Sequence, residues 1–380
     1  MRVLIAVTHL LGTGHLSRAL TLGRAFSAAG HRVQVVSGGG PTQQLDCKGV
    51  ELIQLPPLRS NGVAFSQLLT PAGALATDAY LASRIERLCE AVRQVQPDVL
   101  ITELFPFGRR SLRREFLALL ETAQALPKRP VVLASIRDIL APPSTSKKAV
   151  DAARVLAEHY DGVLVHSDPH ATRLETSWPV TPGISAMLHY TGYVAPEPPA
   201  PHPEKLGEGE ILVSAGGGSV GEALYRIALQ SALLWPERPW RILVGGNDSK
   251  EQIKRLIEEQ SGSPARLEAA RPDFRQMLRS AAASVSMCGY NTAMDLLQTG
   301  VPAVIVPFDA GNEVEQSLRA SSLTPLDGIA AISAADLTPE TLCTAIDSVI
   351  AAPARPIDGF RFDGAVRTVE IAAKLTKERA

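Results

Sequence analysis

The stretch RVLIAVTHLLGTGHLSRALTLGRAFSAAGHRVQVVS (residues 2–37) decides the fold that we expect for this chain. Its first run, 2–7, has the length and β-branched content of a buried strand. Residues 16–30 carry apolar side chains at helical spacing and end at Gly30, a common way to end a helix. Residues 31–37 predict a second strand. The stretch therefore predicts a βαβ unit with a Gly-X-Gly turn before its helix.

The turn GTGH at 12–15 allows two interpretations. Gly12 and Gly14 let the backbone pass close to a ligand, or simply make a tight turn. A nicotinamide site needs a third glycine, where Ser17 stands, and an acidic residue about 20 residues further on. No Asp or Glu precedes Asp46, so we set a dehydrogenase aside. His15 can take a proton near neutral pH; the alternative is a solvated or helix-capping histidine.

The composition of the whole chain limits the classes of protein to which it can belong. A chain of 380 residues exceeds one typical core, so we expect two domains. Hydrophobic residues make up 45% and charged residues 20%, typical of a soluble globular protein, and the net charge of -1 favours neither nucleic acid nor a membrane. Four widely spaced cysteines without a C-x-x-C motif argue against zinc and disulfides and fit a cytoplasmic protein. We expect neither a signal peptide nor a membrane span, because no apolar run reaches about 18 residues.

Strand and helix patterns alternate along the chain and are interrupted once, by the proline-rich stretch VAPEPPAPHPEKLGEGE at 194–210. Such alternation predicts an α/β protein with two Rossmann-like, doubly wound parallel sheets that face a cleft. The expected parts are an N-terminal domain (1–195), a linker (196–208), a C-terminal domain (209–361) and a final helix that crosses back to the first domain (362–380).

A second glycine loop follows the linker. The stretch ILVSAGGGSVGEALYRIAL (211–229) predicts a strand, the triplet Gly216, Gly217 and Gly218, and a helix that Ser219 can cap. Free N–H groups at such a helix start can bind a phosphate. A plain tight turn is the alternative, and the loop is not a Walker motif because no Gly-Lys-Ser/Thr follows it.

The stretch 286–321 adds polar residues to the same half of the chain. Gly289 predicts a turn, and Asn291 or Thr292 can cap a helix that ends at Gly300. Asp295 in this helix can accept two hydrogen bonds from a ribose, or it is only a charge favoured near a helix start.

A short helix follows the next strand of this stretch. Glu315 and Gln316 near its start can reach the hydroxyls of a bound sugar. The alternative is that both are solvated polar residues.

These motifs resemble the GT-B glycosyltransferases, and above all the MurG-type (family 28) bacterial enzymes that transfer N-acetylglucosamine to the lipid-linked peptidoglycan precursor. The resemblance rests on GTGH (12–15), SAGGGS (214–219) and the segment 288–320, and it covers most of the chain. ITELFPFGRR (101–110) and SIRDIL (135–140) are similar to a group of predicted bacterial glycosyltransferases. The resemblance implies a UDP-sugar co-substrate, with no other cofactor, bound mostly by the second domain.

The resemblance also implies roles for single residues. Asp295 matches the acid that binds the ribose, and Gln316, with Glu315 before it, matches a glutamine pair near the donor sugar. The loop from Gly217 to Ser219 matches the diphosphate loop, and His15 matches the histidine of the N-terminal glycine loop. Arg271 lies near the expected base-binding loop and either pairs with the diphosphate or is a surface charge.

The implied reaction is attack of an acceptor hydroxyl on the anomeric carbon of the donor, with inversion. His15 is the candidate base and Glu103 the second choice; Glu103 alternatively orients substrate or pairs with Arg109. The N–H groups of 216–219 would meet the charge of the departing UDP. No Asp-X-Asp pair stands at a strand end, so we expect no metal.

An arginine cluster follows the strand that ends near Glu103. Arg109 and Arg110 are assigned to the acceptor side, and Arg110, Arg113 and Arg114 share one face if the segment is helical. That face can hold an acceptor phosphate or the anionic headgroups of a membrane, or it is merely solvated. The acceptor itself is not predicted: a glycan, a lipid-linked compound and a small molecule stay open.

Other sequence features leave alternatives. His166 and His170 are expected to be polar loop residues rather than metal ligands. A UDP-sugar epimerase of the same fold is one rival function, although 289–299 offers only Asp295 as an acid. A non-catalytic sugar-nucleotide-binding subunit is the other, and His15 argues against it.

Overall fold

The computed structural model describes residues 1–10, 12–42, 45–60, 67–216, 221–246, 248–308 and 314–379. The chain divides into two compact units. Unit 1 comprises Met1–Pro196 and Arg361–Ala380, and unit 2 comprises Glu197–Phe360. Most of the segment expected as a linker therefore belongs to unit 2, where its His202 is buried against Asp273.

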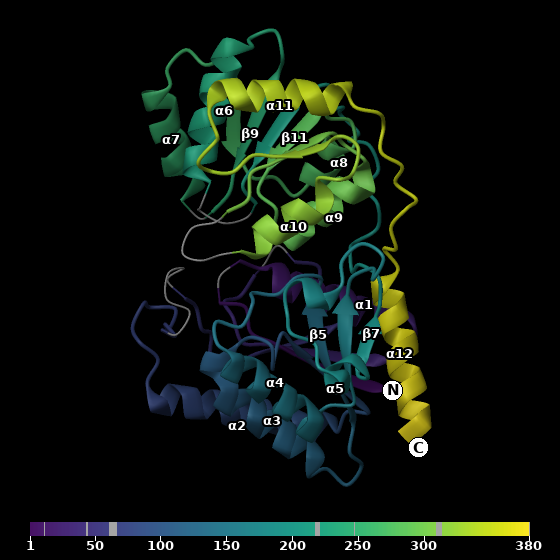
Figure 1. Ribbon diagram of the computed structural model, residues 1–380. Helices are drawn as coiled ribbons and strands as arrows, with labels where there is room; N and C mark the ends of the chain where they lie inside the picture. The colour runs from purple at the N-terminus through teal and green to yellow at the C-terminus, as the bar shows by residue number, and fades with distance from the viewer. Residues whose placement is uncertain are drawn as a thin grey trace. The chain divides into compact units, whose positions relative to one another are not determined.

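Parallel strands form the centre of unit 1 (Figure 1). Within its described residues, seven strands pair in the order β3-β2-β1-β4-β5-β6-β7, the order of a doubly wound sheet. The strands are β1 (Arg2–Val7), β2 (Arg32–Ser37), β3 (Glu51–Gln54), β4 (Val99–Glu103), β5 (Val131–Arg137), β6 (Gly162–His166) and β7 (Leu188–Tyr190).

Helices cover both faces of this sheet, because successive side chains of a strand point to opposite faces. Leu4 and Ala6 of β1 belong to a core with α2, α3 and α4, whereas Val3 and Ile5 belong to a second core with α1 and α12. The helical elements are α1 (Gly14–Ala28), α2 (Asp78–Val95), η1 (Arg110–Leu112), α3 (Arg113–Gln124), α4 (Ser146–His159), η2 (Leu174–Thr176), α5 (Pro182–Ser185) and α12 (Gly364–Arg379).

The last helix, α12, belongs to unit 1 although 164 residues of unit 2 separate it from the rest of that unit in sequence (Glu197–Phe360). It packs against α1 and β5. Its apolar residues Ala365, Val369 and Leu375 join the core that α1 forms with the sheet. The end of the chain thus completes one face of the N-terminal sheet.

Unit 2 repeats the architecture. Its described residues form six parallel strands in the order β10-β9-β8-β11-β12-β13. The strands are β8 (Ile211–Ser214), β9 (Trp240–Val244), β10 (Arg266–Ala269), β11 (Ala283–Ser286), β12 (Ala303–Ile305) and β13 (Ile329–Ala331). The predicted class, α/β with two parallel sheets, is confirmed.

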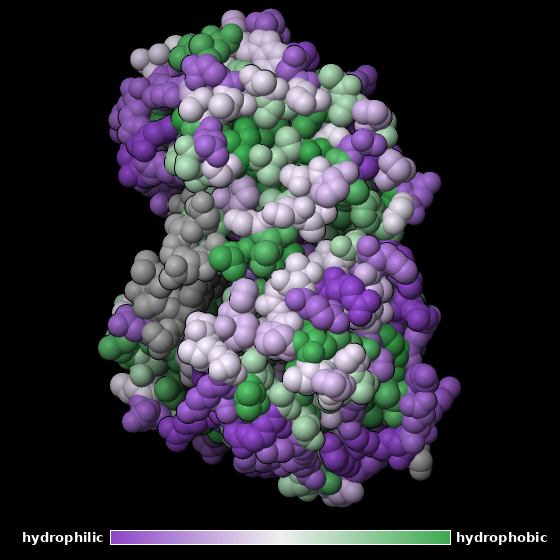
Figure 2. Space-filling view, in the orientation of Figure 1, coloured by the Kyte–Doolittle hydropathy of each residue, from purple (hydrophilic) through white to green (hydrophobic). Residues whose placement is uncertain are grey.

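The helices of unit 2 include α6 and α11, which lie side by side in Figure 1 and share one core with α7 and the sheet. Hydrophilic residues cover α7 on the face that Figure 2 shows, and only Gln252 and Leu256 of this helix are buried. The helices are α6 (Glu222–Leu234), α7 (Ser249–Glu259), α8 (Phe274–Leu278), α9 (Tyr290–Thr299), α10 (Glu315–Leu323) and α11 (Pro339–Ala351).

Two glycines are required by the backbone close to the candidate sites. Gly300 ends α9 with φ 69°, a left-handed conformation that favours glycine. A Cβ on Gly38, just after β2, would lie 2.2 Å from Thr8 Oγ1 and 2.6 Å from the Arg84 guanidinium. Gly38 therefore lets the loops after β1 and β2 approach each other.

Candidate active site

A histidine and a glutamate meet at the carboxyl edge of the sheet in unit 1. Glu103 is the last residue of β4, and His15 is the second residue of α1, which follows the neighbouring strand β1. His15 Nδ1 lies 2.8 Å from Glu103 Oε1. The carboxylate is buried, whereas 15% of the His15 side chain remains exposed. The pair has the geometry of a base and the group that orients it.

Arg18 and Ser135 complete the surroundings of Glu103. Arg18, one turn after His15 on α1, forms a buried ion pair with Glu103 Oε1. Ser135 Oγ donates to the other oxygen, Oε2, over 2.6 Å. Glu103 is thus saturated by donors and placed as a partner of His15 rather than as a second base. Sequence reasoning considered Arg109 as the cation beside Glu103 and missed Arg18, whose i, i+3 spacing from His15 was the available signal.

The charges of this pair follow from its surroundings. Burial opposes ionisation of Glu103, but Arg18 and His15 outweigh it and hold the pKa of Glu103 below its usual value. Burial, together with the nearby Arg109, lowers the pKa of His15 to about 3. At neutral pH the histidine is therefore neutral. Because an ionised carboxylate only accepts hydrogen bonds, the proton sits on Nδ1 and the Nε2 lone pair is available.

The structure describes the glycine loop and the two arginines assigned to the acceptor side. Gly12 is exposed with open space around its Cβ position, and Gly14 is the first residue of α1. Arg109 donates from Nε to the Thr8 carbonyl over 2.7 Å, which ties the loop after β4 to the loop after β1. Arg110 is exposed and donates to the Phe107 carbonyl over 3.2 Å.

The helical face expected for Arg110, Arg113 and Arg114 is wrong in detail. Residues Arg110–Leu112 form a separate 3-10 turn, and the α-helix begins only at Arg113. The break lies at Leu112, the N-cap of α3, whose φ of -106° and ψ of 16° depart from helical values.

The expectation that His166 is a polar loop residue is also wrong. His166 ends β6 and is fully buried, and its ring nitrogens lie 3.0 Å from Ser135 Oγ and 2.9 Å from Thr191 Oγ1. The apolar run 162–165 carries it into the sheet. His170 is exposed, as expected.

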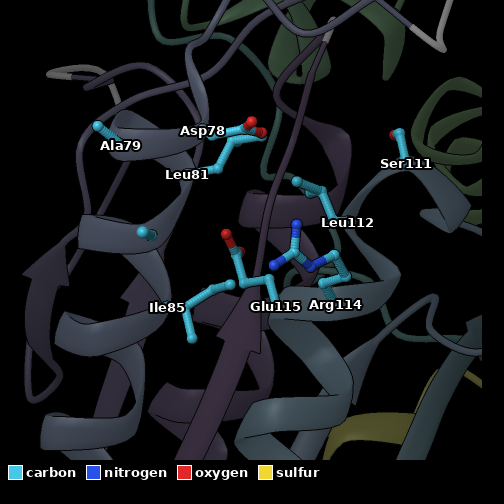
Figure 3. A pocket seen from close by; sticks show the side chains of 9 residues that line it. Asp78, Ala79, Leu81, Ile85, Ser111, Leu112, Arg114 and Glu115 are labelled. Atoms are coloured by element: carbon cyan, nitrogen blue, oxygen red, sulfur yellow. The ribbon is translucent and has the colours of Figure 1, made fainter.

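A cavity of about 420 Å³ lies between α2 and α3 of unit 1 (Figure 3). Leu81 and Ile85 line it from α2, and Leu112, Arg114 and Glu115 line it from η1 and α3. Both helices begin at the carboxyl edge of the sheet, because each follows a parallel strand. Unit 1 therefore has an apolar, partly charged hollow at the edge that also carries His15.

In unit 2, the residue expected to bind ribose forms an ion pair. Asp295 Oδ1 on α9 lies 2.6 Å from Arg275 Nε on α8, and Arg275 NH2 donates to Gln298 Oε1 over 2.6 Å. Burial raises the pKa of Asp295 to about 6, and Arg275 opposes that shift. One carboxylate oxygen is committed to Arg275. Sequence reasoning missed Arg275, which lies 20 residues away in the chain.

The start of α9 differs from the prediction. We expected Asn291 or Thr292 to cap this helix, but the N-cap is Gly289, with extended backbone and no side-chain hydrogen bond. Asn291 is the second residue of the helix and is exposed. Asn291 and Thr292 thus take helical positions rather than the capping position.

Gln316 is placed by backbone contacts of its side chain. Its Oε1 accepts from Cys288 N over 2.9 Å and from Phe308 N over 3.1 Å, which joins the loops after β11 and β12. This oxygen is therefore engaged within the protein. Glu315, the first residue of α10, is buried rather than solvated.

Arg271 is fixed by its own neighbours. It makes a bidentate pair with Asp273 at 2.8 and 2.6 Å, and Asp273 in turn lies 3.0 Å from His202 Nε2. Of the two interpretations left open, the structure shows a paired, partly exposed arginine after β10. The Arg271 pair holds the pKa of Asp273 below its usual range.

The phosphate loop falls mostly outside the described residues. Gly216 has φ 81° and its N–H donates to Ser214 Oγ over 3.2 Å. Gly217, Gly218 and Ser219 are not described. Helix α6 begins at Glu222 with Gly221 as its N-cap, later than the helix that the sequence predicted after Ser219.

No group of three or more His, Cys, Asp or Glu residues is arranged to hold a metal ion in the part of the chain that the structure describes. None of the described helices is long and apolar enough to cross a membrane.

Comparisons with known proteins agree with this architecture. Residues 211–358 match the family model of the glycosyltransferase family 28 C-terminal domain. The chain is 25% identical over 354 residues to the UDP-N-acetylglucosamine--N-acetylmuramyl-(pentapeptide) pyrophosphoryl-undecaprenol N-acetylglucosamine transferase of Rhodospirillum rubrum, which covers 90% of this chain and 82% of that relative. The enzyme of the same name from Granulibacter bethesdensis is 28% identical over 212 residues, 54% of this chain and 53% of that relative.

Solved structures show the same fold. MurG of Acinetobacter baumannii aligns with a TM-score of 0.61 at 16% identity, over 98% of this chain and 100% of that one. The UDP-GlcNAc 2-epimerase of Methanocaldococcus jannaschii aligns with a TM-score of 0.59 at 10% identity, over 98% of this chain and 100% of that one. Two Rossmann-like units with these neighbours show the GT-B fold.

The chain is a glycosyltransferase. It resembles the MurG-type enzymes, and its residues 211–358 match the C-terminal domain of glycosyltransferase family 28.

Proposed function

We propose that this glycosyltransferase transfers a sugar from a UDP-sugar to an acceptor hydroxyl, with inversion and without a metal ion, and that the sugar is N-acetylglucosamine. The observation that carries the proposal is the pair of His15 and Glu103, a neutral histidine oriented by a saturated carboxylate. The donor is suggested by the relatives of 25–28% identity, whose names contain UDP-N-acetylglucosamine.

In the proposed step, His15 Nε2 takes the proton of the acceptor hydroxyl as its oxygen attacks the anomeric carbon. The bond between that carbon and the UDP oxygen breaks, and UDP leaves with the bonding electrons from the opposite face. The new bond therefore has inverted configuration. Glu103 stabilises the imidazolium that forms on His15, as a carboxylate does in other base–carboxylate pairs.

The donor side of the proposal rests on unit 2. Asp295 has a second carboxylate oxygen for a ribose hydroxyl, and the loop around Gly216 is the candidate for the diphosphate. Metal independence is suggested by the lack of an Asp-X-Asp pair in the sequence. The acceptor is proposed to be a hydroxyl compound held by unit 1, lipid-linked or not, and a lipid-linked acceptor would bring the protein to the inner face of the membrane as a peripheral protein.

Donor binding is tested with UDP and a panel of nucleotide sugars. We expect UDP and UDP-N-acetylglucosamine to raise the melting temperature, because a ligand of the native state stabilises it. Asp295→Ala is expected to weaken UDP binding roughly tenfold, as for a lost hydrogen bond to a charged group. Asp347→Ala, which removes an exposed carboxylate on α11, is the matched control. An unchanged affinity of Asp295→Ala for UDP would refute the ribose assignment.

The base is tested by His15→Ala. We expect loss of turnover by roughly 10²–10⁴-fold, the usual contribution of a general base, with donor affinity retained. The measurement is UDP released from the stabilising donor with a panel of lipid-linked and water-soluble hydroxyl compounds. His170→Ala removes an exposed histidine of the same unit and serves as the control. Isomerised UDP-sugar formed without any acceptor would instead favour the epimerase.

A further inference from the structure

A buried chain of polar side chains continues from Glu103 across the sheet of unit 1. Ser135 on β5 lies opposite Glu103 in the strand register, and its Oγ is 2.6 Å from Glu103 Oε2. His166 Nε2 lies 3.0 Å from the same Ser135 oxygen, and His166 Nδ1 lies 2.9 Å from Thr191 Oγ1. Ser135, His166 and Thr191 are all fully buried. Burial of polar side chains costs free energy unless they are hydrogen-bonded, and these three are bonded to one another within the chain.

The positions of the protons in this chain follow from the charge on Glu103. Two donors, Arg18 and His15, converge on Oε1, so the carboxylate is ionised and must also accept from Ser135. The Ser135 hydroxyl has then used its only hydrogen and accepts from His166 Nε2–H. In a neutral His166 the other nitrogen, Nδ1, carries a lone pair and accepts from the Thr191 hydroxyl, which also lies 2.7 Å from the Gly192 carbonyl. The hydrogens of Ser135 Oγ and His166 Nε2 therefore point toward Glu103.

We propose that Ser135 and His166 are positioning residues of this glycosyltransferase: through Glu103 they hold His15 with its Nε2 lone pair directed to the acceptor. The role rests on the proposed function of His15 as the base. Hydrogen bonds that are aligned in one direction polarise one another. The hydrogen bonds of His166 and Ser135 together therefore hold the Glu103 carboxylate more firmly than the hydrogen bond of Ser135 would by itself.

The charged groups around the pair support a fixed arrangement. Arg18 on α1 and Arg109 after β4 act on His15, as does Arg137 at the end of β5. Three cations near one histidine disfavour a protonated imidazole, and Glu103 is the carboxylate that opposes them. The acceptor oxygen therefore meets a neutral base.

The same chain of hydrogen bonds predicts a specific response to Ser135→Ala. Without the hydroxyl, His166 Nε2–H loses its hydrogen bond to Ser135. Thr191 Oγ1 also lies 2.7 Å from the Gly192 carbonyl, so its hydroxyl can turn there and accept from His166 Nδ1 instead. The proton of His166 is then expected to move from Nε2 to Nδ1.

The test is ¹⁵N NMR of the full-length protein labelled at histidine, at neutral pH and without substrate. We expect His166 to be protonated on Nε2 and His15 on Nδ1 in the wild type, and His166 to switch to Nδ1 in Ser135→Ala. Thr102→Val is the matched control, because it removes a buried hydroxyl next to Glu103 that bonds Tyr160 and lies outside the chain. A wild-type His166 protonated on Nδ1 or on both nitrogens, or an unchanged His166 in Ser135→Ala, overturns the proposal.

Turnover gives a second, independent readout. Ser135→Ala is expected to lower kcat roughly tenfold with KM for the donor unchanged, the effect of one hydrogen bond to a charged group. His166→Asn should do the same, and the double variant should lose no more than the larger single loss, because both act through one carboxylate. Additive losses overturn the positioning role. If the wild type transfers no sugar, the proposed function is refuted. The histidine tautomers measured by NMR then still test the chain of hydrogen bonds by themselves.

Discussion

At the residue scale, burial shifts the pKa values of two ionisable groups in opposite directions, and each shift favours the neutral form of the group. It lowers the pKa of His15 to about 3 and raises the pKa of Asp295 to about 6. His15 is therefore a neutral base across the physiological range. Asp295 is ionised only above pH 6, so its capacity to accept hydrogen bonds from a ribose depends on pH.

UDP binding should accordingly weaken in acid in a way that depends on Asp295. Between pH 7.5 and pH 5 the carboxylate gains a proton, and the protonated form accepts hydrogen bonds less well. We expect the affinity ratio of wild type to Asp295→Ala to fall toward one over this range, measured by calorimetry. The ratio cancels the titration of UDP itself. A ratio independent of pH contradicts either the raised pKa or the ribose contact.

At the element scale, a buried ion pair joins helices α2 and α3 of unit 1. Arg84 donates to both oxygens of Glu115 over 2.8 and 2.9 Å, and to the Gly38 carbonyl over 3.0 Å. It also bonds the Pro56 carbonyl. One guanidinium thus connects two helices with the loops after β2 and β3. Glu115 also lines the cavity between the helices, so the pair shapes that hollow.

Removing one partner of this pair should be strongly destabilising. Glu115→Ala leaves the buried Arg84 charge without its carboxylate, which typically costs about 3–5 kcal/mol. Chemical denaturation measures the loss in the free energy of unfolding. Glu121→Ala, an exposed glutamate on the same helix, should change that free energy by less than about 0.5 kcal/mol. Equal effects of the two variants would show that the pair adds no stability.

At the scale of the whole molecule, the described histidines give unit 1 a dependence on pH. Burial lowers the pKa of five of them, and each is protonated in the unfolded chain before it is protonated in the folded one. The five are His9, His15, His31, His166 and His189. Stability therefore rises with pH up to about 6.5, since the unfolded state binds more protons below that value.

His166 allows this dependence to be isolated. Burial lowers its pKa to about 3, so the wild type loses roughly 1.4 kcal/mol per pH unit from this group below pH 6.5. His166→Asn should unfold with a shallower pH dependence between pH 6.5 and pH 4, whatever its absolute stability. His170→Asn, at an exposed position, should keep the wild-type slope. Parallel curves for wild type and His166→Asn would contradict the lowered pKa.

Local sequence determined most of the architecture, because a buried parallel strand needs a continuous apolar run whatever its neighbours are. The runs at 2–7 and 31–37 predicted β1 and β2 to within one residue. Strands β7 and β13, of three residues each, were not predicted. They carry no long apolar run and exist because the edge of a sheet offers them a partner.

The candidate site shows the same division. A histidine in a glycine turn was visible in the sequence, and so was the carboxylate at the end of a strand. Only the tertiary structure brought His15, Glu103, Ser135 and His166 together, because strand order and register place residues from four separate segments at one sheet edge. The partners of Asp295 and Gln316 were decided in the same way. The spacing of apolar residues in the sequence indicates which face of a helix or strand is buried. Which side chain of another element lies opposite that face depends on how the elements pack.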